Sequence, residues 1–340
     1  MVLTDSRRLD EVPETKMTYD PPFGRIGRAR IVVLTITPDE FVGVRKALRA
    51  THMINGTPHF ATTKARRVWD VVVSRCPDRS NIPTVGTVKD IIDDLRPQIL
   101  VLVGTAGALC DEAKSDTGQP ILVPREGLKL GDVVVAEYVD YIDFVKITDK
   151  GMFLRHYVYD HPSLSLRNSV IAGIEADYNL AKAITYRMPR SAADASKKAP
   201  AEPPKIICGP IVSGDKIMGG VDNQVQTGLL QPFDKSLAVE MEAVGMARAV
   251  CEQRKTFWYN PRYAVIRGIS DIVGLEGNNA TRAAWTKFAV HTATLVLAEF
   301  IKRLPMERED RRTTKAKRPS RPTISRTPAR KPVSKKRKRR

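Results

Sequence analysis

Short apolar runs, rich in β-branched residues, recur along the chain with segments of helical periodicity between them. The runs are almost continuous in apolar residues, which is typical of strands buried on both faces of a sheet. We predict strands at residues 31–36, 99–103, 133–136, 206–212, 237–239 and 263–266. Apolar positions recur at helical spacing at Phe41, Val44 and Leu48, at Ala243, Val244, Ala247, Val250 and Cys251, and at Phe288, Thr292, Leu295 and Val296. This alternation predicts an α/β fold with a mostly parallel or mixed sheet.

Two long stretches lack the pattern of a folded core. Residues 187–204 have the Pro, Ala, Ser and Lys bias of an exposed loop, and we expect this loop to be disordered between a predicted helix at 166–184 and the strand at 206–212. Residues 305–340 contain very few apolar residues and repeated proline, so they cannot bury enough surface to fold alone. We predict one folded domain at 28–304, with an extension at 1–27 before it and a tail after it.

The composition is that of a soluble globular protein, with 42% apolar and 28% charged residues among 340. No apolar run approaches the roughly 18 to 20 residues that a membrane span needs, and residues 1–30 are polar rather than of signal-peptide type. We therefore expect a cytoplasmic protein without membrane association. The cysteines lie more than thirty residues apart and the histidines form no pair at helical spacing, so we expect no metal site and no cofactor.

The net charge of +18 is concentrated in the predicted tail. Residues 305–340 carry 16 Lys and Arg against 3 Asp and Glu, so the rest of the chain has a net charge of only +5. Such a tail can bind nucleic acid weakly through counterion release, although it lacks aromatic residues for base stacking. A tail that only increases solubility explains the same composition, and both interpretations stay open.

Polar residues follow four of the predicted strands, and ligands of open α/β sheets bind beyond the carboxyl ends of strands. The four segments are residues 37–40 (TPDE), 104–108 (GTAGA), 240–242 (EME) and 267–271 (RGISD). Each segment also has a purely structural explanation. Acids in a first helical turn cap free N–H groups, a turn of small residues permits tight packing, and an arginine can pair with a neighbouring acid.

The combination of these segments is more specific than any one of them. In order and spacing they resemble the nucleoside phosphorylase superfamily, and within it the methylthioadenosine/S-adenosylhomocysteine nucleosidases. The matching motifs are the acid after the first strand (Glu40), G-T-A-G at 104–107, K-x-G-D-V-V-V-A at 129–136, V-S-G-D at 212–215, V-E-M-E-A at 239–243 and I-R-G-I-S-D at 266–271. The resemblance covers about residues 28–304 and implies a single-domain fold with a central mixed β-sheet flanked by helices, assembled as a homo-oligomer.

The resemblance also implies a role for each residue of these motifs. Asp271 would protonate N7 of the departing purine, with Ser270 positioning its carboxyl. Glu40 would activate the attacking water, and Arg267 would orient the acids. Glu242 would hold the ribose hydroxyls, beside Met241 and the backbone around Glu240. Residues Thr105, Ala106 and Gly107 would lie along the ribose and base.

The sequence departs from the family's pattern at the residues expected to contact the base. The nucleosidases place a phenylalanine that stacks on adenine after the V-S-G-D run, and this chain has Ile217 and Met218 there. An apolar contact is kept and aromatic stacking is lost, so both adenine and another purine stay open as the base.

The nucleophile and the 5′ substituent are further questions. A phosphorylase would need arginines around a phosphate ion, and this chain has an acid after the first strand and Leu102 where those enzymes have an arginine, which favours water. A nucleotide substrate would need cations near its phosphate, and the candidates are Lys146, Lys150, Arg155 and Lys216. We expect a purine nucleoside or nucleotide N-glycosidase. The alternatives are a phosphate-dependent phosphorylase, a nucleotide-depleting defence effector that acts on AMP or ATP, and a non-catalytic nucleoside sensor tethered to nucleic acid.

Overall fold

The computed structural model describes residues 29–54, 57–62, 69–155, 161–189, 202–216, 218–220, 224–254 and 259–304. All of them lie within the first of the two units into which the chain divides, Met1–Pro305. The predicted extension, the predicted tail, Ile217 and most of the loop predicted at 187–204 lie outside the described residues. The predicted domain boundaries therefore stay predictions.

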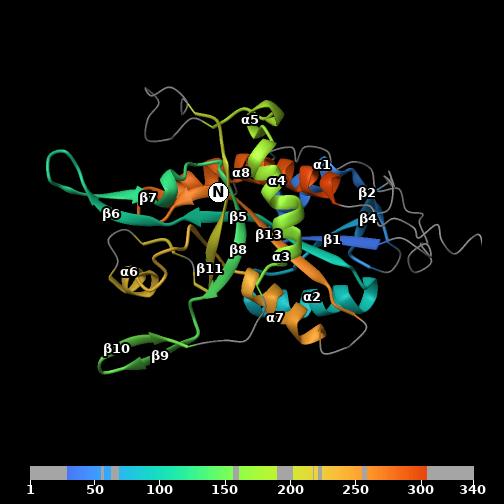
Figure 1. Ribbon diagram of the computed structural model, residues 1–340, viewed down its shortest axis with the longest axis horizontal. Coiled ribbons are helices and arrows are strands. Elements are labelled where there is room, and N and C mark those ends of the chain that lie inside the picture. Colours follow the sequence, from blue (N-terminus) through green and yellow to red (C-terminus); the bar gives the residue numbers. More distant parts are fainter. Residues whose placement is uncertain are drawn as a thin grey trace, which may run out of the picture. The chain divides into compact units, whose positions relative to one another are not determined.

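A mixed sheet, with nine strands in the described ranges, forms the centre of the fold (Figure 1). Strands β1, β4, β5 and β13 are parallel, whereas β8 runs antiparallel to β13 and parallel to β11. Because β12 pairs with both β11 and β5, the strands β5, β13, β8, β11 and β12 close into a ring. In sheet order the strands are β12 (Ala238–Glu240), β11 (Ile206–Ser213), β8 (Val133–Tyr141), β13 (Arg262–Ile272), β5 (Ile99–Ala108), β1 (Ala29–Thr35), β4 (Trp69–Arg75), β3 (Phe60–Thr62) and β2 (Ala50–Met53).

Helices cover both faces of this sheet, as the nearly continuous apolar strands require. Helices α1 (Pro38–Leu48) and α8 (Asn278–Arg303) pack on one face, and α2 (Asn81–Leu95) and α7 (Ala243–Gln253) pack together on the other (Figure 1). Alternate residues of β1 divide between the two cores. Ile31 and Val33 join the cluster under α1 and α8, whereas Val32 and Leu34 join the cluster under α2 and α7. The predicted α/β fold with a mixed sheet is confirmed.

The six predicted strands and the helices after the first strand, after the fifth and near the end are all present. The single helix predicted at 166–184 is wrong. The chain forms α3 (Leu164–Leu166), a π-helical turn (Arg167–Ile171) and α4 (Ala172–Asp177), and then breaks. Tyr178 has extended backbone angles, and Asn179 caps the separate short helix α5 (Leu180–Ala183) through its side chain. An Asn that accepts a backbone N–H at a helix start favours a new helix over a continued one.

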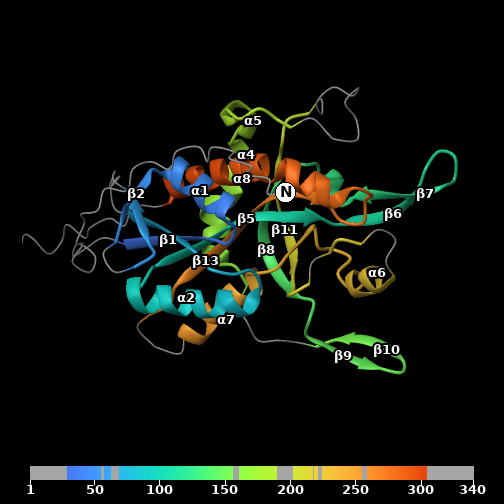
Figure 2. The same ribbon diagram turned by 180° about the vertical axis from the view of Figure 1, so that it is seen from behind.

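Two hairpins extend away from the central sheet (Figure 2). They are β6 (Cys110–Lys114) with β7 (Pro120–Pro124), and β9 (Val145–Thr148) with β10 (Gly151–Leu154). The 3-10 helix Arg125–Gly127 follows β7, and the short helix α6 (Gln224–Leu230) precedes β12. Within the described ranges, none of the helices combines the length and apolar character needed to span a bilayer.

Candidate active site

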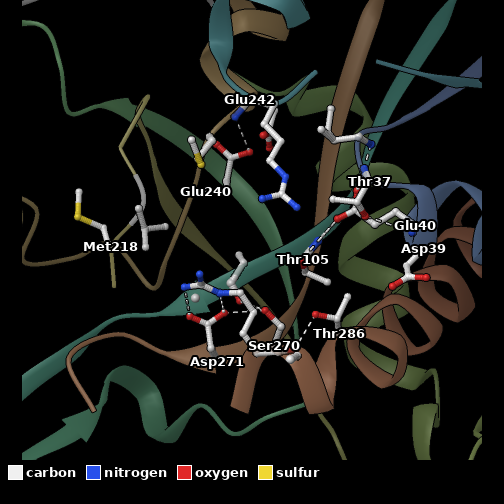
Figure 3. Close-up of a pocket in the computed structure, with 18 of the residues that line it drawn as sticks. Thr37, Asp39, Glu40, Thr105, Met218, Glu240, Glu242, Ser270, Asp271 and Thr286 are labelled. Carbon is white, nitrogen blue, oxygen red and sulfur yellow. Dashed lines mark hydrogen bonds and ion pairs between the residues drawn. The ribbon is translucent and has the colours of Figure 1, made fainter. Parts of the chain in front are cut away.

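A cavity of about 480 Å³ gathers residues from segments that are far apart in the sequence (Figure 3). Its wall is formed by the start of α1, the second half of β5, the end of β12, the second half of β13 and the first turns of α8. Of the residues predicted for the site, those that line the cavity are Glu40, Thr105, Ala106, Gly107, Met218, Glu240, Met241, Glu242, Ser270 and Asp271. Arg267 lies behind the wall, in contact with two of these acids, and Ile217 lies outside the described residues.

Two of the segments predicted to follow strands are in fact parts of strands. Strand β5 continues through the GTAGA segment to Ala108, and β13 continues through Arg267–Asp271 to Ile272. The two strands stay paired over this length because each supplies the other's backbone hydrogen bonds. A bulge between Ile269 and Asp271 shifts the register, so Asp271 pairs with Gly107. A bulge of this kind re-aims the side chains that follow it, and here Asp271 faces the cavity.

Glu40 is held at the start of α1 by backbone N–H groups. Its Oε2 accepts hydrogen bonds from Ile36 N at 3.0 Å and Thr37 N at 2.9 Å, and the Thr37 hydroxyl accepts from Glu40 N at 3.3 Å. This capping box is the structural explanation that the sequence allowed. Glu40 also reaches across to β5, where its Oε1 accepts from Thr105 N at 2.9 Å. The carboxylate is therefore fixed in position, 3% exposed, at the cavity wall.

Gly104 permits the close approach of Glu40 and Arg267. A Cβ atom at this position would lie 2.4 Å from Arg267 Nη1 and 2.5 Å from Glu40 Oε1. Both distances are far below van der Waals contact, so a side chain at residue 104 would push the acid and the guanidinium apart. The glycine of the G-T-A-G motif is required here for space.

Arg267 is fully buried and joins the two glutamates of the V-E-M-E-A motif. Its Nη2 donates to Glu240 Oε2, and to Glu242 Oε2 at 3.1 Å. Glu240 also caps α7 by accepting from Glu242 N and Ala243 N. Helix capping is therefore confirmed as one role of Glu240. Glu242 has a different environment, because its Oε1 accepts a long 3.3 Å bond from Ser80 N, and its carboxyl faces the cavity.

The electrostatics of this cluster separate the two glutamates. Burial raises the pKa of Glu242 to about 7, and the negative charges of Glu240 and Glu40 add to this effect while Arg267 opposes it. For Arg267, burial lowers the pKa, but the charges of Glu240, Glu242 and Glu40 outweigh burial and raise it overall. The site therefore holds a permanent cation behind a carboxyl group that titrates near neutral pH.

Asp271 lies on the side of the cavity opposite Glu242, and it has a partner that the sequence did not reveal (Figure 3). The Ser270 hydroxyl donates to Asp271 Oδ1 at 2.7 Å, as the motif implied. In addition, Arg282 on α8 binds both carboxylate oxygens, with Nε to Oδ1 at 3.1 Å and Nη2 to Oδ2 at 2.8 Å. The hydrogen bond to Asp271 raises the pKa of Arg282. Asp271 is 1% exposed, so its carboxylate is compensated mainly by this arginine.

Further cavity residues were missed because no motif marks them. Arg282 lies eleven residues after Asp271, in a part of α8 whose sequence has no apolar periodicity. Arg79 lies in the loop before α2, a helix that the sequence did not predict. Of the predicted phosphate contacts, Lys216 lines the cavity, whereas Lys146, Lys150 and Arg155 do not. The sequence signal for the start of this helix was the pair Ser80 and Asn81, residue types that begin helices, directly after Arg79.

The geometry can support proton transfer and stabilise positive charge. Three carboxylates, those of Glu40, Glu242 and Asp271, face one cavity from three sides (Figure 3). Arg267 lies behind Glu242, and Arg282 pairs with Asp271. Within the described ranges, no group of three His, Cys, Asp or Glu side chains is arranged to hold a metal ion.

Comparisons with known proteins place this chain in a family. The family model of the phosphorylase superfamily matches residues 30–303. A curated relative, the 5′-methylthioadenosine/S-adenosylhomocysteine nucleosidase of Staphylococcus aureus strain JH9, is 25% identical over 208 residues, covering 61% of this chain and 72% of the relative.

Two solved structures share the fold. The S-adenosylhomocysteine nucleosidase of Streptococcus pyogenes, in complex with 5-methylthiotubericidin, has a TM-score of 0.59 at 18% identity and covers 83% of this chain and 100% of its own. The futalosine hydrolase of Helicobacter pylori strain 26695 has a TM-score of 0.57 at 18% identity and covers 81% of this chain and 98% of its own.

Proposed function

This chain belongs to the phosphorylase superfamily, and we propose that it is a purine nucleosidase that hydrolyses the N-glycosidic bond and releases the free base. The observation that carries the proposal is the placement of Glu40, Glu242 and Asp271 on three sides of one cavity. The names of the relatives, which are nucleosidases and a futalosine hydrolase, support the same reaction class on different substrates. The family that the sequence motifs indicated is confirmed by the family model.

The proposed reaction breaks the bond between C1′ of the ribose and the purine nitrogen. The bonding electrons leave with the base, which takes a proton at N7 from Asp271, and the ribose develops an oxocarbenium-like positive charge. Glu242 binds the ribose hydroxyls and stabilises this charge. Water then bonds to C1′ and gives its proton to Glu40, which the backbone N–H groups of Ile36, Thr37 and Thr105 hold in place.

The pair between Asp271 and Arg282 constrains the protonation step. Both oxygens of Asp271 are engaged by Arg282, and Oδ1 also accepts from Ser270. Asp271 can act as the acid only when substrate binding shifts Arg282 away from it and the freed carboxylate takes up a proton from solvent, which it then passes to N7. The arginine is one third exposed, so it has room to move toward solvent.

Water is the proposed nucleophile because acids occupy the start of α1. Asp39 and Glu40 line the cavity there, and a phosphate ion beside two carboxylates would be repelled. At the base, Met218 lines the cavity and is 6% exposed, so it can give the purine an apolar contact in place of an aromatic ring. We propose adenine as the base, which the names of the relatives support.

Replacing Asp271 with Asn tests the proposed acid. The amide keeps the size of the side chain and can still accept a hydrogen bond from Ser270, but it cannot donate the proton to N7. We expect base release to fall by about 10² to 10⁴-fold, the typical contribution of general acid catalysis, with an unchanged circular dichroism spectrum. Turnover near the wild-type rate in a folded variant would rule out this role for Asp271.

A further inference from the structure

Two cations of the cavity wall flank one hydrogen-bonded cluster in sequence. Arg79 and Lys216 both line the cavity, and each is next in sequence to a residue of one hydrogen-bonded cluster. Within this cluster, Asp215 Oδ1 accepts from Ser80 Oγ at 2.6 Å and from Asn81 N at 2.8 Å. The cluster therefore ties the loop before α2 to the end of β11 and brings Arg79 and Lys216 to the same part of the wall.

Arg79 lies at the ribose side of the cavity rather than at the base side. Ser80, the neighbour of Arg79, donates its backbone N–H to Glu242 Oε1 at 3.3 Å. Glu242 is the residue proposed to hold the ribose hydroxyls, and it lies across the cavity from Asp271 (Figure 3). A group that Arg79 contacts would therefore be attached to the ribose or lie beside it.

Arg79 has no acidic partner within the part of the chain that the structure describes, which sets it apart from the other cations of the cavity wall. Lys216 contacts Asp143, and Arg282 is held by Asp271. The only hydrogen bond of Arg79 there is made by its backbone N–H to Asp78. Its side chain is exposed, so the fold does not need this guanidinium for packing. An arginine that faces a cavity with all its donors free is suited to bind an anion in two-point contact.

On the basis of the function proposed above, we infer that the substrate carries a phosphate on its ribose and that Arg79, with Lys216, binds this phosphate. The cavity also contains five carboxylates, those of Asp39, Glu40, Glu240, Glu242 and Asp271. These would repel a phosphorylated substrate unless cations met the phosphate at the cavity wall. An uncharged 5′ group, such as a thioether, gains nothing from an unpaired guanidinium. Nucleotides are therefore expected to be cleaved in preference to nucleosides.

The test measures kcat/KM of the full-length protein for adenosine, 5′-AMP and 3′-AMP, and for adenosine with added inorganic phosphate. We expect 5′-AMP or 3′-AMP to exceed adenosine, and the better of the two identifies the hydroxyl that bears the phosphate. In Arg79→Ala, the ratio of kcat/KM for AMP to kcat/KM for adenosine should fall by about 10- to 100-fold, which is the loss expected for a hydrogen-bonded charge contact. Arg79→Lys keeps the charge but not the two-point contact and should lose less.

Lys146→Ala is the matched control. Lys146 lies on the β9–β10 hairpin and does not line the cavity, so removing it lowers the net charge without changing the wall, and the ratio should not change. Adenosine cleaved in preference to both AMP isomers, or an equal fall in the ratio for Lys146→Ala, would overturn the inference and leave the nucleosidase intact. If adenosine is cleaved only when inorganic phosphate is added, the cations bind free phosphate rather than a phosphate of the substrate. That result would also overturn the inference. Release of no base from any compound would contradict the proposed function itself.

Discussion

At the scale of single residues, Glu242 has the most unusual environment in the site. It is 6% exposed, and this burial, with the negative charges of Glu240 and Glu40, raises the pKa of its carboxyl from 4.5 to about 7 against the opposing charge of Arg267. The folded protein therefore binds a proton at Glu242 over a pH range in which the unfolded chain has lost it. Stability then decreases as the pH rises from about 4.5 to about 7, because the folded state must give up this proton.

Replacing Glu242 with Gln removes this contribution. Between about pH 5 and pH 8, we expect the wild type to lose roughly 1 to 3 kcal/mol more unfolding free energy than the variant loses, since each pKa unit corresponds to about 1.4 kcal/mol. Denaturant titrations of both proteins at the two pH values measure the difference. Other carboxyls with raised pKa values, such as Asp132 and Asp140, affect both proteins equally and cancel. Parallel pH dependences would contradict the buried-acid interpretation of Glu242.

At the scale of elements, the site depends on how closely α8 packs on β13. Gly268 lies in β13 between Arg267 and the Ser270–Asp271 bulge, and a Cβ atom there would lie 2.1 Å from the Ala289 carbonyl oxygen of α8. This atom belongs to backbone in the middle of a long buried helix, so it cannot rotate away. The glycine therefore sets the distance between the strand that carries Asp271 and the helix that carries Arg282.

Gly268→Ala should destabilise the protein by about 2 to 4 kcal/mol through overpacking and should lower base release. Gly86→Ala is the matched control, since Gly86 lies in α2 with nothing within 4 Å of a Cβ atom. That substitution should stabilise the protein by about 0.5 to 1 kcal/mol, because alanine favours helix over glycine. Thermal and denaturant unfolding of the two variants measures both effects. A Gly268→Ala variant as stable as Gly86→Ala would contradict the close packing.

The sequence was sufficient to predict the buried strands, because their apolar runs reflect burial on both faces. The resemblance of its motifs to the nucleosidases also implied that Glu40, Glu242 and Asp271 share one site, and all three line the cavity. The sequence failed where local signals are ambiguous. The GTAGA and RGISD segments were expected to follow the strands, and their pairing with each other keeps them extended to Ala108 and Ile272.

Contacts between residues far apart in the sequence were the second kind of feature that the sequence did not predict. The pair between Arg282 and Asp271 depends on where α8 starts, at Asn278 after Gly277 in the left-handed conformation, and the Gly-Asn-Asn sequence there has no helical periodicity. The position of Arg79 depends on hydrogen bonds from Ser80 and Asn81 to Asp215, which is more than 130 residues away. No periodicity or local motif encodes such contacts. For this reason we also predicted phosphate contacts at Lys146, Lys150 and Arg155, which do not line the cavity.

At the scale of the whole molecule, the net charge is divided unevenly, with 16 Lys and Arg in residues 305–340. Nucleic-acid binding by this segment and assembly into a homo-oligomer both stay predictions. Counterion release predicts that full-length protein binds DNA with an affinity that falls about 10³-fold between about 50 and 200 mM salt if six or more phosphates are neutralised. A chain ending at Leu304 should lose this binding. Fluorescence anisotropy with a labelled duplex compares the two proteins, and equal affinities would exclude a role for the tail.

The central claim is that this cavity hydrolyses an N-glycosidic bond with water as the nucleophile. The most direct measurement incubates the purified protein with methylthioadenosine, S-adenosylhomocysteine, adenosine, inosine, AMP and ATP, each with and without phosphate, and identifies the products by chromatography. We predict free base together with a ribose product that carries no new phosphate, formed equally in phosphate-free buffer. A ribose 1-phosphate that appears only when phosphate is added would contradict the claim.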